Sequence, residues 1–228
     1  KGLSITVDLL SPIRIRDIFT TSIPAICADI TFHNESKSEK TITTDFSFQS
    51  GKFGSEISET SAEKLHLVGN GQIAIGFDSE IEWQKLNDGI QVNCSSVVPV
   101  GGSKKVRMII LCYDENGYYA NKCSDINDLA MHVDSSWDRF RQDVDHFIAS
   151  LPKTHDEQVN RYLHWYLQAA LLLTRTTKDH VLNMGYSEFN QRDSYWTSWL
   201  QVAFWPELER RMIQESIDHQ REDGKIPT

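Results

Sequence analysis

Residues 127–151, NDLAMHVDSSWDRFRQDVDHFIASL, mark the point at which the sequence changes its hydrophobic period. Before this stretch, short runs often alternate apolar and polar residues, and after it apolar residues recur every three or four positions. The first spacing is typical of strands and the second of amphipathic helices. The run SSWD at 135–138 can cap a helix, so we predict a helix from there to about Leu151, ended by Pro152. We therefore expect strands before about residue 125 and helices after about residue 135.

The first half is rich in predicted strands. Turn residues separate them, and Asn70-Gly71 and Asp88-Gly89 are typical of tight hairpin turns. Strands at this spacing, with no helical pattern between them, favour an antiparallel β-sandwich, which we assign to residues 1–126. The predicted strands cover residues 3–10, 25–33, 41–48, 72–77, 89–94 and 105–113.

The second half is predicted to be helical. Residues 127–152 form a linker helix, and helices continue through 153–228. Thr154 and Glu157 are spaced as in a capping box, which opens a helix to about Thr174. Two more helices are expected, from Ser194 to about Trp205 and from Pro206 to about Gln220.

Composition excludes several classes of function. The net charge of −9 argues against nucleic acid as a partner, because binding phosphates requires clustered Lys and Arg. No apolar run approaches the roughly 20 residues of a membrane span. The cysteines form no CxxC pair and the histidines no HxxxH pair, so we expect neither a metal nor a cofactor. We expect a soluble protein; the compartment, cytoplasmic or exported, and the oligomeric state stay open.

The chemistry is concentrated in residues 185–227, GYSEFNQRDSYWTSWLQVAFWPELERRMIQESIDHQREDGKIP. Arg192-Asp193 precedes a predicted helix whose first turn carries Tyr195 and Trp196. Aromatic rings bind the apolar faces of sugars, while carboxylate and guanidinium groups bind their hydroxyls. These four residues therefore form a candidate carbohydrate site. The alternative is that Asp193 only caps the helix and Arg192 lies on the surface.

Two further sets of residues allow alternative interpretations. Glu188 lies near Asp193 and could be half of a glycosidase carboxylate pair, or it could be a solvated loop acid. Trp165 and Tyr166 lie within a predicted helix, where we expect them in the core, with a ligand platform as the alternative.

Residues 189–206, FNQRDSYWTSWLQVAFWP, resemble the start of the second barrel helix of (α/α)6-barrel glycoside hydrolases. Residues 192–194 match the Arg-Asp-Ser run of the amylo-α-1,6-glucosidase (glycogen-debranching) type. Asp193 and residues 204–207 fall at places comparable to those of the glucosylceramidase-type β-glucosidases of family 116. Residues 11–34 look like the amino-terminal β-sandwich of family 116.

The resemblance implies an α+β multidomain fold: an N-terminal antiparallel β-sandwich, a helical linker and the first helices of an (α/α)6 barrel over 153–228. It implies hydrolysis of a glucoside-like sugar or oligosaccharide, with Asp193 binding sugar hydroxyls where the bond is cut. Glu188 is the nearest carboxylate to the place of the family 116 nucleophile, at a shorter spacing. The general acid would lie beyond Thr228, which implies that this chain is the front portion of a longer enzyme.

Two other functions remain open. The chain could be a non-catalytic carbohydrate-binding or scaffold module of the same fold, or a purely structural interaction domain. A second carboxylate on a downstream barrel loop would favour the enzyme, and a lack of sugar affinity would favour the structural domain.

Overall fold

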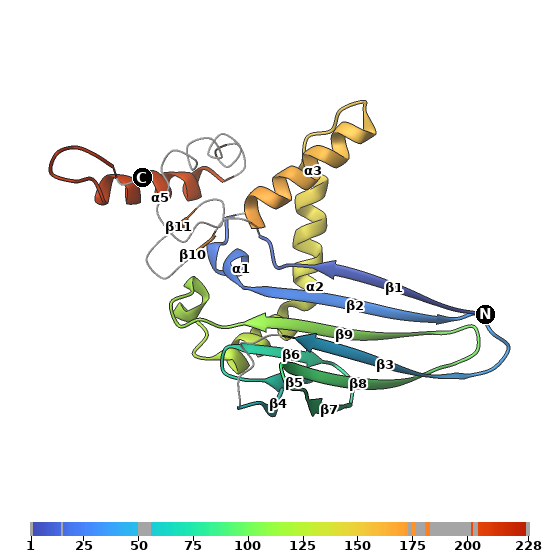
Figure 1. The fold of residues 1–228 in the computed structure, drawn as a ribbon. Coiled ribbons are helices and arrows are strands. Elements are labelled where there is room, and N and C mark those ends of the chain that lie inside the picture. The colour runs from blue at the N-terminus through green and yellow to red at the C-terminus, as the bar shows by residue number, and fades with distance from the viewer. Residues whose placement is uncertain are drawn as a thin grey trace. The chain divides into compact units, whose positions relative to one another are not determined.

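The computed structural model describes residues 2–14, 16–49, 56–172, 175–176, 181–182, 202 and 205–226, and its fold in these residues is α+β with antiparallel sheets (Figure 1). The contacts divide the chain into two units, each described by itself. The first comprises Lys1–Ser11, Pro24–Glu115 and Cys123–Trp137, and the second Pro12–Ile23, Asn116–Lys122 and Asp138–Thr228.

The first unit contains two antiparallel sheets. The larger has six strands in the order β1-β2-β9-β6-β5-β4, and the smaller has three in the order β3-β8-β7. In the larger sheet the strands are β1 (Leu3–Leu10), β2 (Ala25–Asn34), β9 (Ser103–Cys112), β6 (Ile73–Phe77), β5 (Leu65–Gly69) and β4 (Ser58–Ala62). In the smaller they are β3 (Lys40–Gln49), β8 (Gly89–Val98) and β7 (Ile81–Lys85).

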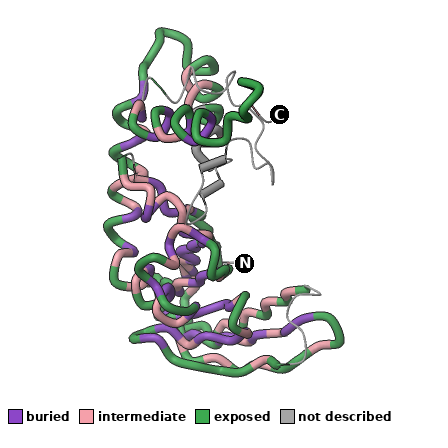
Figure 2. The backbone as a smooth tube through the Cα atoms, turned by 90° about the vertical axis from the view of Figure 1, so that its left-hand side faces the viewer, coloured by how far each residue is buried: buried purple, intermediate pink, exposed green. Residues whose placement is uncertain are grey.

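The two sheets share one apolar core. Buried positions alternate with partly buried or exposed ones along much of β8, so one face of the strand points into this core. Figure 2 shows buried residues interspersed with exposed ones along the described backbone. Ile30 and Phe32 on β2 and Ile90 and Val92 on β8 belong to the same buried cluster. This arrangement agrees with the predicted antiparallel sandwich.

The six predicted strands are confirmed, as β1, β2, β3, β6, β8 and β9. The Asn70 turn is confirmed as well, since the Asn70 side chain accepts hydrogen bonds from the backbone N–H groups of Gln72 and Ile73. The sequence did not predict β4, β5 and β7, which have five residues each. So short a segment shows few periods of alternation, and the Ser-Glu-Thr-Ser-Ala sequence of β4 is almost entirely polar.

The helix α2 (Ile126–Ser150) spans nearly the same residues as the expected linker helix, 127–152, but it begins earlier than the cap predicted at residues 135–138. Its end near Leu151 is confirmed, but the predicted start at the 135–138 run is wrong. The cap is Asp125, whose Oδ1 accepts the backbone N–H of Asp128 at 2.8 Å. Leu129, Val133 and Trp137, four residues apart, are buried on one face, so their packing extends the helix toward its N-terminus.

This early part of α2 covers the face of the large sheet that points away from the sandwich core. Trp137 Nε1 donates a hydrogen bond of 3.2 Å to Asp29 Oδ1 on β2. Asp29 is only 3% exposed and also pairs with Lys105 at 3.3 Å and Arg107 at 3.7 Å. An unpaired carboxylate in such a place would cost several kcal/mol, so these partners allow its burial.

The second unit is mainly helical. Its other elements are α1 (Ile18–Ser22), the 3-10 helix η1 (Tyr118–Asn121), α3 (Glu157–Leu172), β10 (Arg175–Thr176), β11 (Val181–Leu182) and α5 (Pro206–Asp218). The predicted helix from Pro206 is confirmed, with the proline in its first turn. Residues 194–201 and 203–204 lie outside the described residues, and the barrel stays a prediction.

The predicted capping box of α3 is wrong in detail. The cap is Asp156, whose Oδ1 accepts the N–H groups of Gln158 at 2.8 Å and Val159 at 3.2 Å. The Thr154 hydroxyl instead donates to Asn160. An aspartate one residue before the helix is better placed to cap it than a threonine three residues before it.

Candidate functional site

The five predicted site residues lie in one segment that is outside the described residues. This segment is residues 183–201, and it contains Glu188, Arg192, Asp193, Tyr195 and Trp196. Their roles therefore stay predictions. The described residues before and after the segment supply the structural context.

One apolar cluster of the second unit holds residues from both sides of this segment. Trp205, Leu208 and Met212, in and just before α5, are buried in it. Leu163 on α3 packs against the same cluster. The remaining members are Ile13, Phe147 and Leu151, with Ile18, Val144 and Ile148 partly buried against them. The helices α3 and α5, which lie before and after this segment in the sequence, therefore share a core.

Glu209 is a buried carboxyl group on α5 that the sequence analysis did not identify. It is 6% exposed, and within the described part of the chain its Oε2 has no hydrogen-bond partner. Burial raises the pKa of Glu209, because desolvation disfavours the charged form. A carboxyl group with a raised pKa keeps its proton to a higher pH than an ordinary carboxyl group does. No sequence pattern distinguishes Glu209 from its exposed neighbour Glu207 in the same turn.

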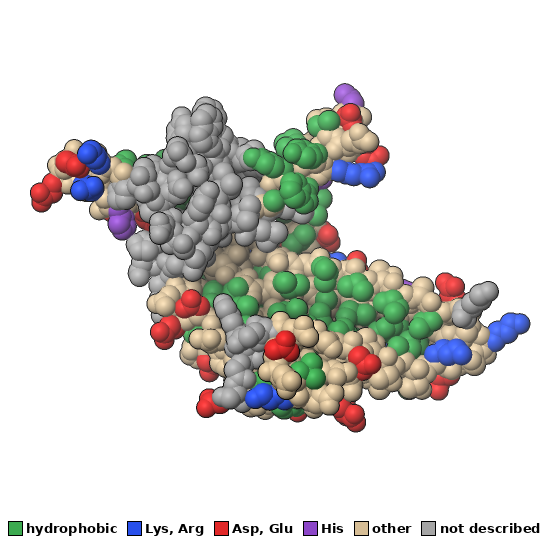
Figure 3. All heavy atoms as spheres, in the orientation of Figure 1, with side chains coloured by type: hydrophobic (Ala, Val, Ile, Leu, Met, Phe, Trp, Pro, Cys, Tyr) green, Lys and Arg blue, Asp and Glu red, His purple; other side chains and the backbone are tan. Residues whose placement is uncertain are grey.

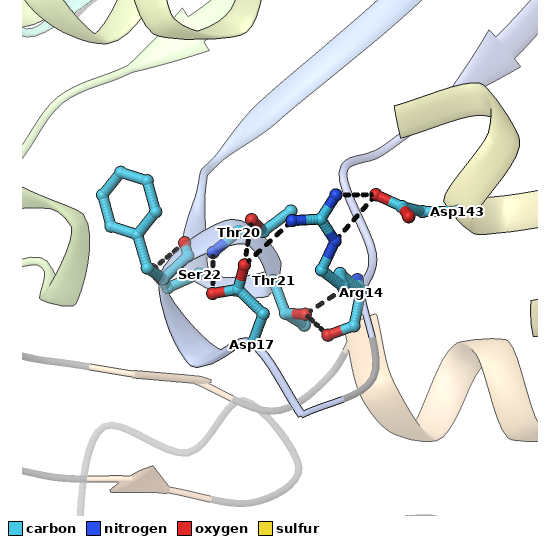
Figure 4. Close-up of polar contacts among 7 residues, drawn as sticks. Arg14, Asp17, Thr20, Thr21, Ser22 and Asp143 are labelled. Carbon is cyan, nitrogen blue, oxygen red and sulfur yellow. Dashed lines mark hydrogen bonds and ion pairs between the residues drawn. The ribbon is translucent and has the colours of Figure 1, made fainter. Parts of the chain in front are cut away.

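A polar network ties the start of α1 to α2 within the second unit (Figure 4). The guanidinium of Arg14 donates to Asp143 Oδ2 through Nε, at 2.9 Å, and lies 2.6 Å from it through Nη2. Asp17 caps α1 by accepting the N–H and hydroxyl of Thr20. Burial alone would raise the pKa of Asp17, but the Thr20 bonds and Arg14 hold it below its usual value. Each of these groups has its partner within the network, so the network has a structural role.

The helix α3 exposes an aromatic surface. Tyr162 is 69% exposed and Trp165 63% exposed, and their ring centroids lie 6.3 Å apart at an angle of 42°. Tyr166 and Val159 are exposed beside them, and apolar side chains gather on this helix in Figure 3. The expectation that Trp165 and Tyr166 lie in the core is therefore wrong, because Leu163 supplies the packing face of α3. This surface has the chemistry of a sugar-stacking platform.

Two further findings concern the described residues as a whole. No group of three or more His, Cys, Asp or Glu side chains is arranged there to hold a metal ion. None of the helices described is both long enough and apolar enough to span a membrane.

Comparisons with known proteins found likenesses among solved structures. No family model matches this chain, and no curated protein matches it. A solved chain described as "Putative kojibiose phosphorylase from human microbiome" matches with a TM-score of 0.37 and 10% sequence identity. The match covers 74% of this chain and 21% of that chain, so this chain spans about a fifth of the length of its structural neighbour.

Proposed function

We propose that this chain is part of a carbohydrate-processing enzyme that binds a glucoside-like sugar through residues 192–196. The observation that carries the proposal is the composition of this run, in which a guanidinium, a carboxylate and two aromatic rings fall within five residues. The Asp193 carboxylate accepts hydrogen bonds from two vicinal hydroxyls, Arg192 donates to ring oxygens, and Tyr195 or Trp196 stacks on the apolar face of the sugar.

The proposed reaction is hydrolysis of a glycosidic bond. One carboxylic acid protonates the glycosidic oxygen as its bond to the anomeric carbon breaks, and a carboxylate on the opposite side activates water or attacks that carbon. Glu188 takes the second role in this proposal. The first belongs to an acid that the resemblance places downstream, so we expect no turnover from the 228-residue chain alone.

The proposal predicts that Asp193→Asn in the full-length protein weakens activity or sugar affinity at least tenfold, or about 1.4 kcal/mol. The melting temperature should hardly change, because Asn caps a helix about as well as Asp. Sugar titration by calorimetry beside a thermal melt checks both.

Asp156→Asn is the matched control, since Asp156 is an established helix cap on α3. It should change neither affinity nor melting temperature. If Asp193→Asn behaves like Asp156→Asn, Asp193 is only a cap and the proposed site fails.

A second candidate function is non-catalytic carbohydrate binding, and the exposed Tyr162–Trp165 pair favours it. An exposed aromatic face at this spacing can stack on sugar rings without any acid nearby. Trp165→Ala should then lower affinity for an oligosaccharide about fivefold or more, since ring stacking of this kind is worth about 1 kcal/mol or more. Val159→Ala, which shortens an exposed aliphatic side chain on the same helix, is the control. Equal affinities of the two variants would eliminate this candidate.

A further inference from the structure

We draw no further inference here: the strongest candidate, the carboxyl group of Glu209 in the first turn of α5, is distinguished only by its burial and its raised pKa, and nothing in the described residues shows which ligand or partner faces it.

Discussion

Two buried carboxyl groups show that the energetic cost of burying a carboxylate depends on its partners. Asp29 is held by the indole N–H of Trp137 and by two cationic side chains on β9. Glu209 is similarly buried, but the described residues give its Oε2 no partner. Desolvation therefore raises the pKa of Glu209 without a compensating charge. The two groups should respond to substitution in opposite ways.

We predict that Glu209→Gln makes the protein more stable at neutral pH, by about 1 kcal/mol. The folded state binds the Glu209 proton more tightly than the unfolded state, so the wild-type protein loses stability as the pH rises from the ordinary value of 4.5 through the raised pKa. Gln has no charge to desolvate, so this part of the pH dependence should disappear.

Urea unfolding from about pH 4 to about pH 8 measures the effect. Glu207→Gln, at an exposed site in the same helical turn, is the control and should change the free energy of unfolding by less than about 0.5 kcal/mol. A Glu209→Gln variant that is clearly less stable at pH 7 would mean that the carboxylate is hydrogen-bonded.

Among the helices and strands, the sequence predicted those that have a clear hydrophobic period. It missed the boundary that depends on packing against a distant part of the chain. The long strands β3 and β8 alternate along most of their ten residues, enough to identify them from the pattern alone. The start of α2 depends on contacts with a sheet distant in sequence, because Trp137 reaches Asp29. The Ser135 run resembles a cap, but its position in the fold makes it an ordinary helical turn.

The two possible starts of α2 predict different effects of alanine substitution. If α2 begins after Asp125, Asp125→Ala should cost about 1 kcal/mol, because the N–H of Asp128 loses its acceptor. Ser135→Ala should be neutral or slightly stabilising, because alanine has the highest helix propensity and Ser135 is exposed. Thermal melts of the two variants measure both. A loss of about 1 kcal/mol in Ser135→Ala alone would restore the start predicted from sequence.

For the molecule as a whole, the chain crosses between units more often than the sequence indicates. The hydrophobic period predicts one boundary near residue 126, whereas the contact division assigns Pro12–Ile23 and Asn116–Lys122 to the second unit and Cys123–Trp137 to the first. Neither of these short segments of the second unit has a hydrophobic period of its own. The hydrophobic pattern therefore could not show that they leave the first unit. Sequence also identified the candidate site residues, but their geometry lies outside the described residues.

The division of the chain into two compact units predicts that the β-sandwich is stable only together with the first part of α2. A fragment of residues 1–126 lacks Leu129, Val133 and Trp137, and the buried Ile109 and Leu111 of β9 would lose their cover. Deleting one large buried side chain typically costs about 2–5 kcal/mol, so removing three should cost about as much as the whole stability of a domain, about 5–15 kcal/mol. We therefore expect fragment 1–126 to show no cooperative urea transition, while fragments 1–137 and 1–150 unfold cooperatively with similar midpoints.

Fragment 1–137 is the matched control, because it ends where the first unit ends. If fragment 1–126 unfolds as cooperatively and at the same urea concentration as fragment 1–150, the sandwich is complete without α2 and the helix is only a linker.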